Sequence, residues 1–139
     1  MTLMRIVILE DSAADLRLFK EALHAARIFA ELYHFPDGIS AIESITSSGE
    51  AWTPAPDLIV LDIDMPRMTG LEVLEILRSS PRFSKVPVAV FTSSRSPGDM
   101  SRARDLRADR FIVKPTTLVE FFEAVRATVR EFSSAEGPV

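Results

Sequence analysis

The stretch "LIVLDIDMPRMTG", residues 58–70, begins as a strand suited to a hydrophobic core and ends as a loop. Four apolar residues are followed by Asp62 and Asp64, and then by Pro66 and Gly70. A short, continuous apolar run is typical of a strand buried on both faces of a parallel sheet. Because a buried carboxylate without a partner is costly, we expect the two acids to face solvent or a positive group at the end of this strand.

The rest of the chain repeats this pattern of a short apolar run followed by an amphipathic stretch. Runs rich in β-branched residues predict further buried strands, a more mixed segment predicts an edge strand, and apolar residues at helical spacing lie between them. Five alternations of strand and helix indicate an α/β fold with a parallel sheet and helices on both faces. The further predicted buried strands are residues 4–9, 86–91 and 110–113, and the predicted edge strand is 30–35.

The length of 139 residues indicates one domain, which we place at residues 1–132. The tail 133–139, "SSAEGPV", is expected to be disordered. Ser12 followed by Asp15 resembles a capping box at the start of the first helix. The connection 46–56 is longer than such units usually need.

Composition excludes several classes of function. The net charge is −4 and no basic run is present, which argues against direct binding of nucleic acid. The chain has no cysteine, so disulfides and thiolate metal sites are excluded, and a reducing cytoplasm is the expected compartment. No apolar run approaches the ~20 residues of a membrane span. Acids at positions 10 and 11 come too early for a signal peptide.

Polar residues follow the predicted strands at the points where ligands bind in open α/β sheets. Taken singly, each is an ordinary helix cap, turn or loop residue, but their joint arrival at one edge favours a site. Oxygen ligands without Cys or nearby His favour Mg²⁺, and a lysine and a hydroxyl could bind phosphate oxygens. This is the outline of a phosphoryl-transfer site in which an Asp carboxylate can be the nucleophile. The residues are Glu10, Asp11, Asp62, Asp64, Thr92 and Lys114.

Four motifs together resemble a response-regulator receiver domain of the CheY-like type, over nearly the whole chain. The spacing between Asp62, Thr92 and Lys114 agrees with that family as well. The resemblance implies a five-stranded parallel sheet in the order 2-1-3-4-5, the flavodoxin-like arrangement. The motifs are "ILEDS" (8–12), "LIVLDIDMPRMTGLEVL" (58–74), "VAVFTSS" (88–94) and "FIVKP" (111–115).

The resemblance also implies roles for these residues. Asp62 would accept a phosphoryl group from a histidine kinase in a two-component phosphorelay, so that the protein catalyses only its own phosphorylation and dephosphorylation. Thr92 would sense the phosphate through its hydroxyl, and Lys114 would bind it. A Mg²⁺ would be bound directly by Asp11 and through water by Glu10. Asp62 and the backbone carbonyl of Asp64 would complete the metal ligands.

The chain differs from the family pattern in two places and is similar to one subgroup of the family. Phe111 stands where many members have Tyr, so the predicted switch residue lacks a hydroxyl. No output domain is expected after residue 132. The "EDS-AD" start and the extended 46–56 loop are similar to single-domain regulators that partner phytochrome-like histidine kinases. A sensor kinase of that type is therefore the predicted partner.

The predicted output surface lies on the fourth and fifth helices. A stripe in the fifth helix should pack on the sheet, with Phe121 on a flank that the sheet does not cover. With Arg102, Arg104 and Arg107 of the fourth helix, Phe121 would form a homodimer or kinase-docking surface. The alternative is that Phe121 completes the core. The stripe consists of Leu118, Phe122, Val125, Val129 and Phe132.

Two other functions stay open. One is a receiver-like docking module that is never phosphorylated. The other is a phosphatase of the haloacid-dehalogenase type, which also uses an Asp-x-Asp after a strand with Mg²⁺ and a lysine. An EF-hand at "DIDMPRMTG" is excluded, because Pro66 and Arg67 stand where that loop needs an oxygen ligand and a glycine.

Overall fold

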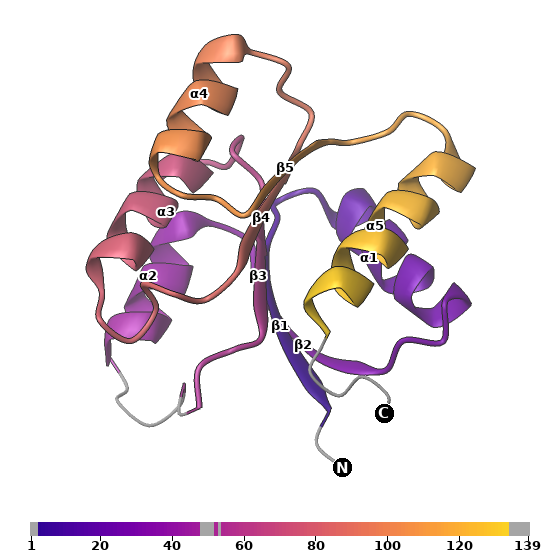
Figure 1. Ribbon diagram of the computed structural model, residues 1–139, viewed down its shortest axis with the longest axis horizontal. Coiled ribbons are helices and arrows are strands. Elements are labelled where there is room, and N and C mark those ends of the chain that lie inside the picture. The colour runs from indigo at the N-terminus through magenta and orange to yellow at the C-terminus, as the bar shows by residue number, and fades with distance from the viewer. Residues whose placement is uncertain (1–2, 48–51, 53, 134–139) are drawn as a thin grey trace.

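The computed structural model describes residues 3–47, 52 and 54–133 (Figure 1). Strands and helices alternate along this part of the chain, as the sequence predicts. The strands are β1 (Met4–Leu9), β2 (Ala30–Phe35), β3 (Leu58–Leu61), β4 (Val88–Thr92) and β5 (Arg110–Val113). The helices are α1 (Ala13–Ala25), α2 (Gly38–Ser47), α3 (Gly70–Ser79), α4 (Pro97–Asp105) and α5 (Leu118–Phe132).

The strands form one parallel sheet in the order β2-β1-β3-β4-β5, so the predicted flavodoxin-like topology is confirmed. Helices α1 and α5 cover one face, and α2, α3 and α4 cover the other (Figure 1). The predicted tail falls outside the described residues except for Ser133, and residues 48–51 and 53 of the long connection also lie outside them.

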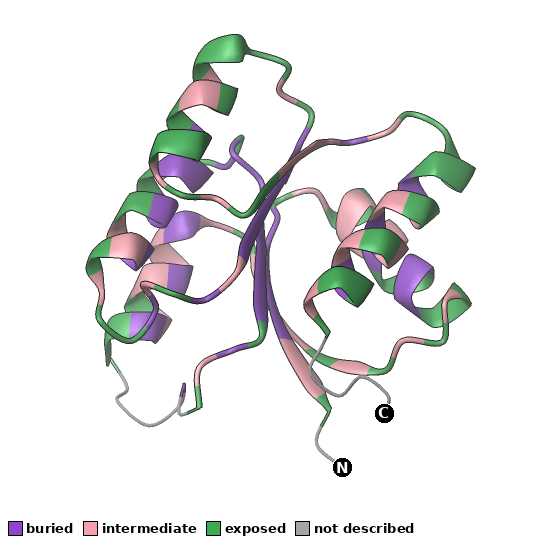
Figure 2. Ribbon diagram, in the orientation of Figure 1, coloured by how far each residue is buried: buried purple, intermediate pink, exposed green. Residues whose placement is uncertain are grey.

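The core lies on both faces of the three central strands. Every residue of β3 and β4 is buried, which explains their continuous apolar runs (Figure 2). The prediction for 110–113 is wrong in one respect, because β5 is an edge strand whose residues are exposed or half-buried. Within the described residues, no helix combines the length and apolar character needed to cross a bilayer.

The face of α5 that packs on the sheet differs from the predicted one. Phe121 is 4% exposed and its ring packs edge-on against Phe91, with 5.2 Å between the ring centroids. Leu118, which was expected to face the sheet, is 57% exposed. The expectation that Phe121 lies on an uncovered flank is therefore wrong. The reason is that α5 packs against α1 as well as the sheet, which covers a second side of the helix.

Candidate functional site

The carboxyl ends of the strands bring the predicted polar residues to one edge of the sheet. Glu10 follows β1, Asp62 follows β3, Thr92 ends β4 and Lys114 follows β5. These four are the buried polar and charged residues of the described chain, each no more than 8% exposed. Four such groups need hydrogen-bonding partners, because unpaired polar groups are costly in a core.

Lys114 lies at the centre of this group. Its Nζ donates hydrogen bonds to Glu10 Oε1 at 2.8 Å and to Asp62 Oδ2 at 2.9 Å. A third bond, at 2.6 Å, goes to Asp15 Oδ2. An ammonium group has three N–H donors, so all are engaged. Although burial opposes its charge, these hydrogen bonds outweigh that effect and raise the pKa of Lys114.

Asp62 is fixed by backbone as well as by Lys114. Its amide donates to Leu9 O at 3.1 Å, which ties the end of β3 to β1. Its Oδ1 accepts from the amide of Asp64 at 3.1 Å. Asp64 itself is exposed, as expected, and its pKa is raised by partial burial and by the charge of Asp62. Asp62 is thus a buried carboxylate that is held in place on both of its oxygens.

Three carboxylates can converge on one metal ion. One oxygen each from Glu10, Asp11 and Asp62 lies within 4.8 Å of the others. Burial raises the pKa of Glu10 to about 7, which shows that negative charge there is incompletely compensated. An all-oxygen set of partly buried carboxylates suits a hard divalent cation such as Mg²⁺. The residues present therefore fit a divalent metal.

Thr92 lies on β4, the neighbour of β3, and is fully buried. Its Oγ1 accepts from the amide of Ser94 at 3.2 Å. Its carbonyl accepts from the amide of Lys114 at 2.8 Å, so the ends of β4 and β5 are joined next to the site. The hydroxyl is therefore placed on the strand beside Asp62, as predicted.

Asp15 is a site residue that the sequence pattern did not identify. Ser12 does cap α1 as predicted, because its side chain accepts from the amide of Asp15 at 3.1 Å. The carboxylate of Asp15 does not complete a capping box, however, and binds Lys114 instead. The signal in the sequence was a third acid, which follows Asp11 by four residues and Glu10 by five.

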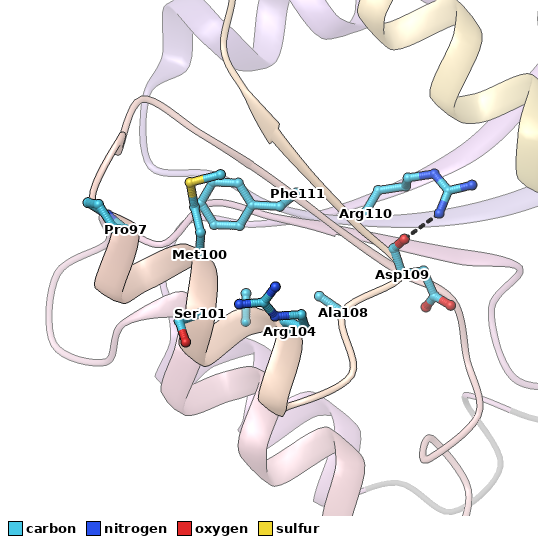
Figure 3. A pocket seen from close by; sticks show the side chains of 9 residues that line it. Pro97, Met100, Ser101, Arg104, Ala108, Asp109, Arg110 and Phe111 are labelled. Carbon is cyan, nitrogen blue, oxygen red and sulfur yellow. Dashed lines mark hydrogen bonds between the residues drawn. The ribbon is translucent and has the colours of Figure 1, made fainter.

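The predicted switch residue lies in a groove between α4 and β5. Phe111 is half-buried and lines this groove of about 470 Å³ beside Met100 (Figure 3). Arg104 lines the same groove. Of the other predicted interface residues, Arg102 is exposed and binds Glu75 Oε1 at 2.9 Å. Arg107 is also exposed, but its predicted place in the fourth helix is wrong, because α4 ends at Asp105 and the φ of Arg107 is 66°.

Comparison with known proteins gives a consistent result. The response regulator receiver domain model matches residues 6–126. The response regulator Rcp1 of Synechocystis is 34% identical over 122 residues, which cover 87% of this chain and 83% of that protein.

Solved structures agree with the sequence matches. The phosphorylated cyanobacterial phytochrome response regulator RcpA superposes with a TM-score of 0.87, at 32% identity and 96% coverage of both chains. The Mn²⁺-bound form of Rcp1 gives 0.85, at 30% identity, with 98% of this chain and 99% of that chain covered. Receiver domains bind a divalent metal and interact with histidine kinases. The chain belongs to the response regulator receiver family, the signal-receiving domains of two-component systems.

Proposed function

We propose that Asp62 is the phosphoacceptor of this receiver and takes its phosphoryl group from a sensor histidine kinase. The observation that carries the proposal is the position of its carboxylate. Asp62 is 5% exposed, and its Oδ2 lies 2.9 Å from Lys114 Nζ at the edge of the sheet where Glu10 and Asp11 converge. A buried carboxylate next to a buried ammonium is oriented for reaction rather than for solvation.

The proposed reaction moves one phosphoryl group between two side chains. A carboxylate oxygen of Asp62 forms a bond to phosphorus while the bond from phosphorus to the kinase imidazole nitrogen breaks, and that nitrogen keeps the electron pair. Lys114 then donates to a phosphoryl oxygen the hydrogen bond that it gave to Asp62, and the Thr92 hydroxyl donates a hydrogen bond to another phosphoryl oxygen. Charge neutralisation and positioning supply most of the catalysis in such transfers.

The proposed metal is Mg²⁺. Glu10, Asp11, Asp62 and the backbone carbonyl of Asp64 would hold it, and it would supply positive charge next to the phosphoryl oxygens. The fit of three carboxylate oxygens within 4.8 Å of one another supports this assignment. The side chain of Asp64 is not among these converging oxygens, so the proposed ligand from this residue is its backbone carbonyl.

The test is phosphorylation by a small phosphodonor such as acetyl phosphate in the presence of Mg²⁺, followed by intact-mass measurement. The parent should gain one acid-labile phosphoryl group, and Asp62→Asn should gain none. Asp64→Asn is the matched control, because its exposed side chain lies two residues away, and it should still be labelled. Undiminished labelling of Asp62→Asn would disprove the assignment. Rapid release of phosphate from generic phosphoesters would instead favour the phosphatase.

A phytochrome-type histidine kinase is the proposed partner of this protein. The proposed domain spans residues 1–132, and the cytoplasm is the proposed compartment. Support comes from the similarity to the cyanobacterial phytochrome response regulator RcpA over 96% of both chains. Phosphotransfer profiling against purified sensor kinases, including phytochrome types, should show the fastest transfer from a phytochrome kinase. Equal or faster transfer from kinases of other classes would contradict this pairing.

The proposed output is a change at the groove of α4 and β5. Movement of Thr92 towards the phosphoryl group would leave space into which Phe111 could turn, and its ring has no hydroxyl to desolvate. Phosphate can shift such an equilibrium only by its differential affinity for the two states. Crystal structures of the free and the phosphorylated protein test this switch. The side chain of Phe111 should have different rotamers in the two structures.

The Arg-rich surface formed by Arg102 and Arg104 of α4 and by Arg107, which follows the helix, is proposed as the contact of a homodimer or a docking kinase. All three side chains belong to exposed residues. Phe121 is no longer part of this surface, since it is buried. Light scattering of the free and phosphorylated protein tests the homodimer, and a monomer in both states would leave only the docking role.

A further inference from the structure

We infer that Asp15 is a positioning residue that retains Lys114 when a divalent metal binds to the neighbouring carboxylates. This inference rests on the metal site of the proposed function. It concerns the one partner of the Lys114 ammonium group that does not belong to the group of converging carboxylates.

Lys114 and a metal compete for the same carboxylates. Its Nζ binds Glu10 and Asp62 at 2.8 and 2.9 Å, and both residues belong to the candidate metal site. A dication arriving there repels the ammonium group and takes the carboxylate charge that stabilises it. A buried ammonium left without a counter-charge would add a large penalty to metal binding. Lys114 is 8% exposed, so water cannot replace the lost partners fully.

Asp15 is placed to prevent that penalty. Its Oδ2 lies 2.6 Å from Lys114 Nζ, the shortest of the three contacts. It approaches from α1, outside the converging group of Glu10, Asp11 and Asp62. The ion pair of Asp15 and Lys114 can therefore persist while the other two contacts are released.

The local hydrogen bonding of α1 explains why the Asp15 carboxylate is available. The third residue of α3, Glu72, completes a capping box by accepting from the amide of Thr69 at 2.9 Å. In α1 the amide of the capping residue Ser12 donates instead to Glu10 Oε2, at 3.2 Å. Glu10 thus takes the role that an acid at position 15 would otherwise have, and the Asp15 side chain turns towards β5.

The first experiment is calorimetric titration of the metal-free protein with Mg²⁺. Asp15→Asn should weaken Mg²⁺ binding by about fivefold or more, a size typical of coupling within one salt-bridge network. Glu120→Gln is the matched control, because Glu120 has the same position in α5 but accepts from its own capping residue, Thr117, at 3.0 Å. It should change Mg²⁺ affinity by less than about twofold, as expected for a residue outside the network.

A second titration separates the action through Lys114 from direct attraction between Asp15 and the metal. In a Lys114→Gln background, or Lys114→Met if only that variant folds by circular dichroism, Asp15→Asn should change Mg²⁺ affinity by less than about twofold. An equal loss in both backgrounds would mean direct attraction and overturn the inference. A parent that binds Mg²⁺ with an unaffected Asp15→Asn variant would overturn the inference alone. A parent that binds no Mg²⁺ would overturn the proposed metal site as well.

Discussion

Gly70 packs directly against the backbone of Asp62. A Cβ atom added at Gly70 would lie 2.1 Å from the Asp62 carbonyl oxygen and 2.9 Å from Leu61 Cδ1. No rotation of a flexible side chain can relieve the first of these contacts, because the atom belongs to the backbone. The start of α3 is therefore seated on the residue proposed to accept the phosphoryl group, and the glycine in "DIDMPRMTG" is a requirement of that contact.

Gly70→Ala should consequently displace the Asp62 backbone and lower the free energy of unfolding by about 1–3 kcal/mol, the range for overpacking. Phosphorylation by acetyl phosphate should fall with it. Gly98→Ala is the control, because the nearest atom to its added Cβ is Ser96 Oγ at 3.5 Å, an ordinary contact. Denaturant unfolding of both variants gives the comparison, and equal stability of the two would refute the close approach.

The pKa of Glu10 predicts a pH-dependent metal affinity. Burial raises this pKa from 4.5 to about 7, whereas a metal needs the carboxylate. Mg²⁺ affinity should therefore rise with pH up to about 7, by no more than about tenfold per unit for one competing proton. The Glu10→Gln variant should bind Mg²⁺ more weakly than the parent at high pH. Its Mg²⁺ affinity should also change less with pH below about 7. Calorimetric titrations at several pH values test this, and identical profiles would contradict it.

The same shift predicts how the metal-free protein responds to pH. A carboxyl group whose folded pKa is raised binds its proton more tightly in the folded than in the unfolded state. Its contribution to stability is complete below pH 4.5 and is lost as the pH rises through about 7. The Glu10→Gln variant should lack this decrease, so the difference in thermal unfolding between parent and variant should change across that window.

Arg27 ends α1 in a conformation that favours glycine. Its φ is 58°, and the amides of Arg27 and Ile28 donate to His24 O and Leu23 O, the two bonds of a Schellman motif. Arg27→Gly should raise the free energy of unfolding by about 0.5–1 kcal/mol by removing the Cβ strain. Ala127→Gly, exposed within α5, should lower it by about 1 kcal/mol. A loss of stability in Arg27→Gly would show that the strain is negligible.

Burial of Phe121 predicts a core role rather than an interface role. Phe121→Ala should lower the free energy of unfolding by about 3–5 kcal/mol, because it opens a cavity beside Phe91. Val119→Ala, on the same helix but 79% exposed, should change it by less than about 0.5 kcal/mol. Chemical denaturation distinguishes the two residues. A small effect of Phe121→Ala would contradict this contribution of Phe121 to the core.

Local patterns in the sequence were sufficient for the alternation of strands and helices and for most of the site, whereas the strand order was expected from the resemblance to receiver domains. The buried runs around Asp62 and Thr92 can be recognised because central parallel strands are apolar on both faces. Parallel strands bring their carboxyl ends to one edge, so Glu10, Asp62, Thr92 and Lys114 could be grouped without knowing any distance. Local patterns do not predict which face of a helix packs on the sheet. The face of α5 depends on its contact with α1, which no periodicity within α5 records.

The sequence by itself determined the five strand–helix units, the parallel sheet and the group of carboxylates at its edge, because hydrophobic periodicity and residue chemistry are local properties. Only the tertiary structure decided that Asp15 binds Lys114 and that Phe121 is buried. Both depend on which neighbour each side chain meets across elements far apart in the chain. Asp15 and Lys114 are separated by 99 positions, and their contact exists because α1 and β5 reach the same edge of the sheet.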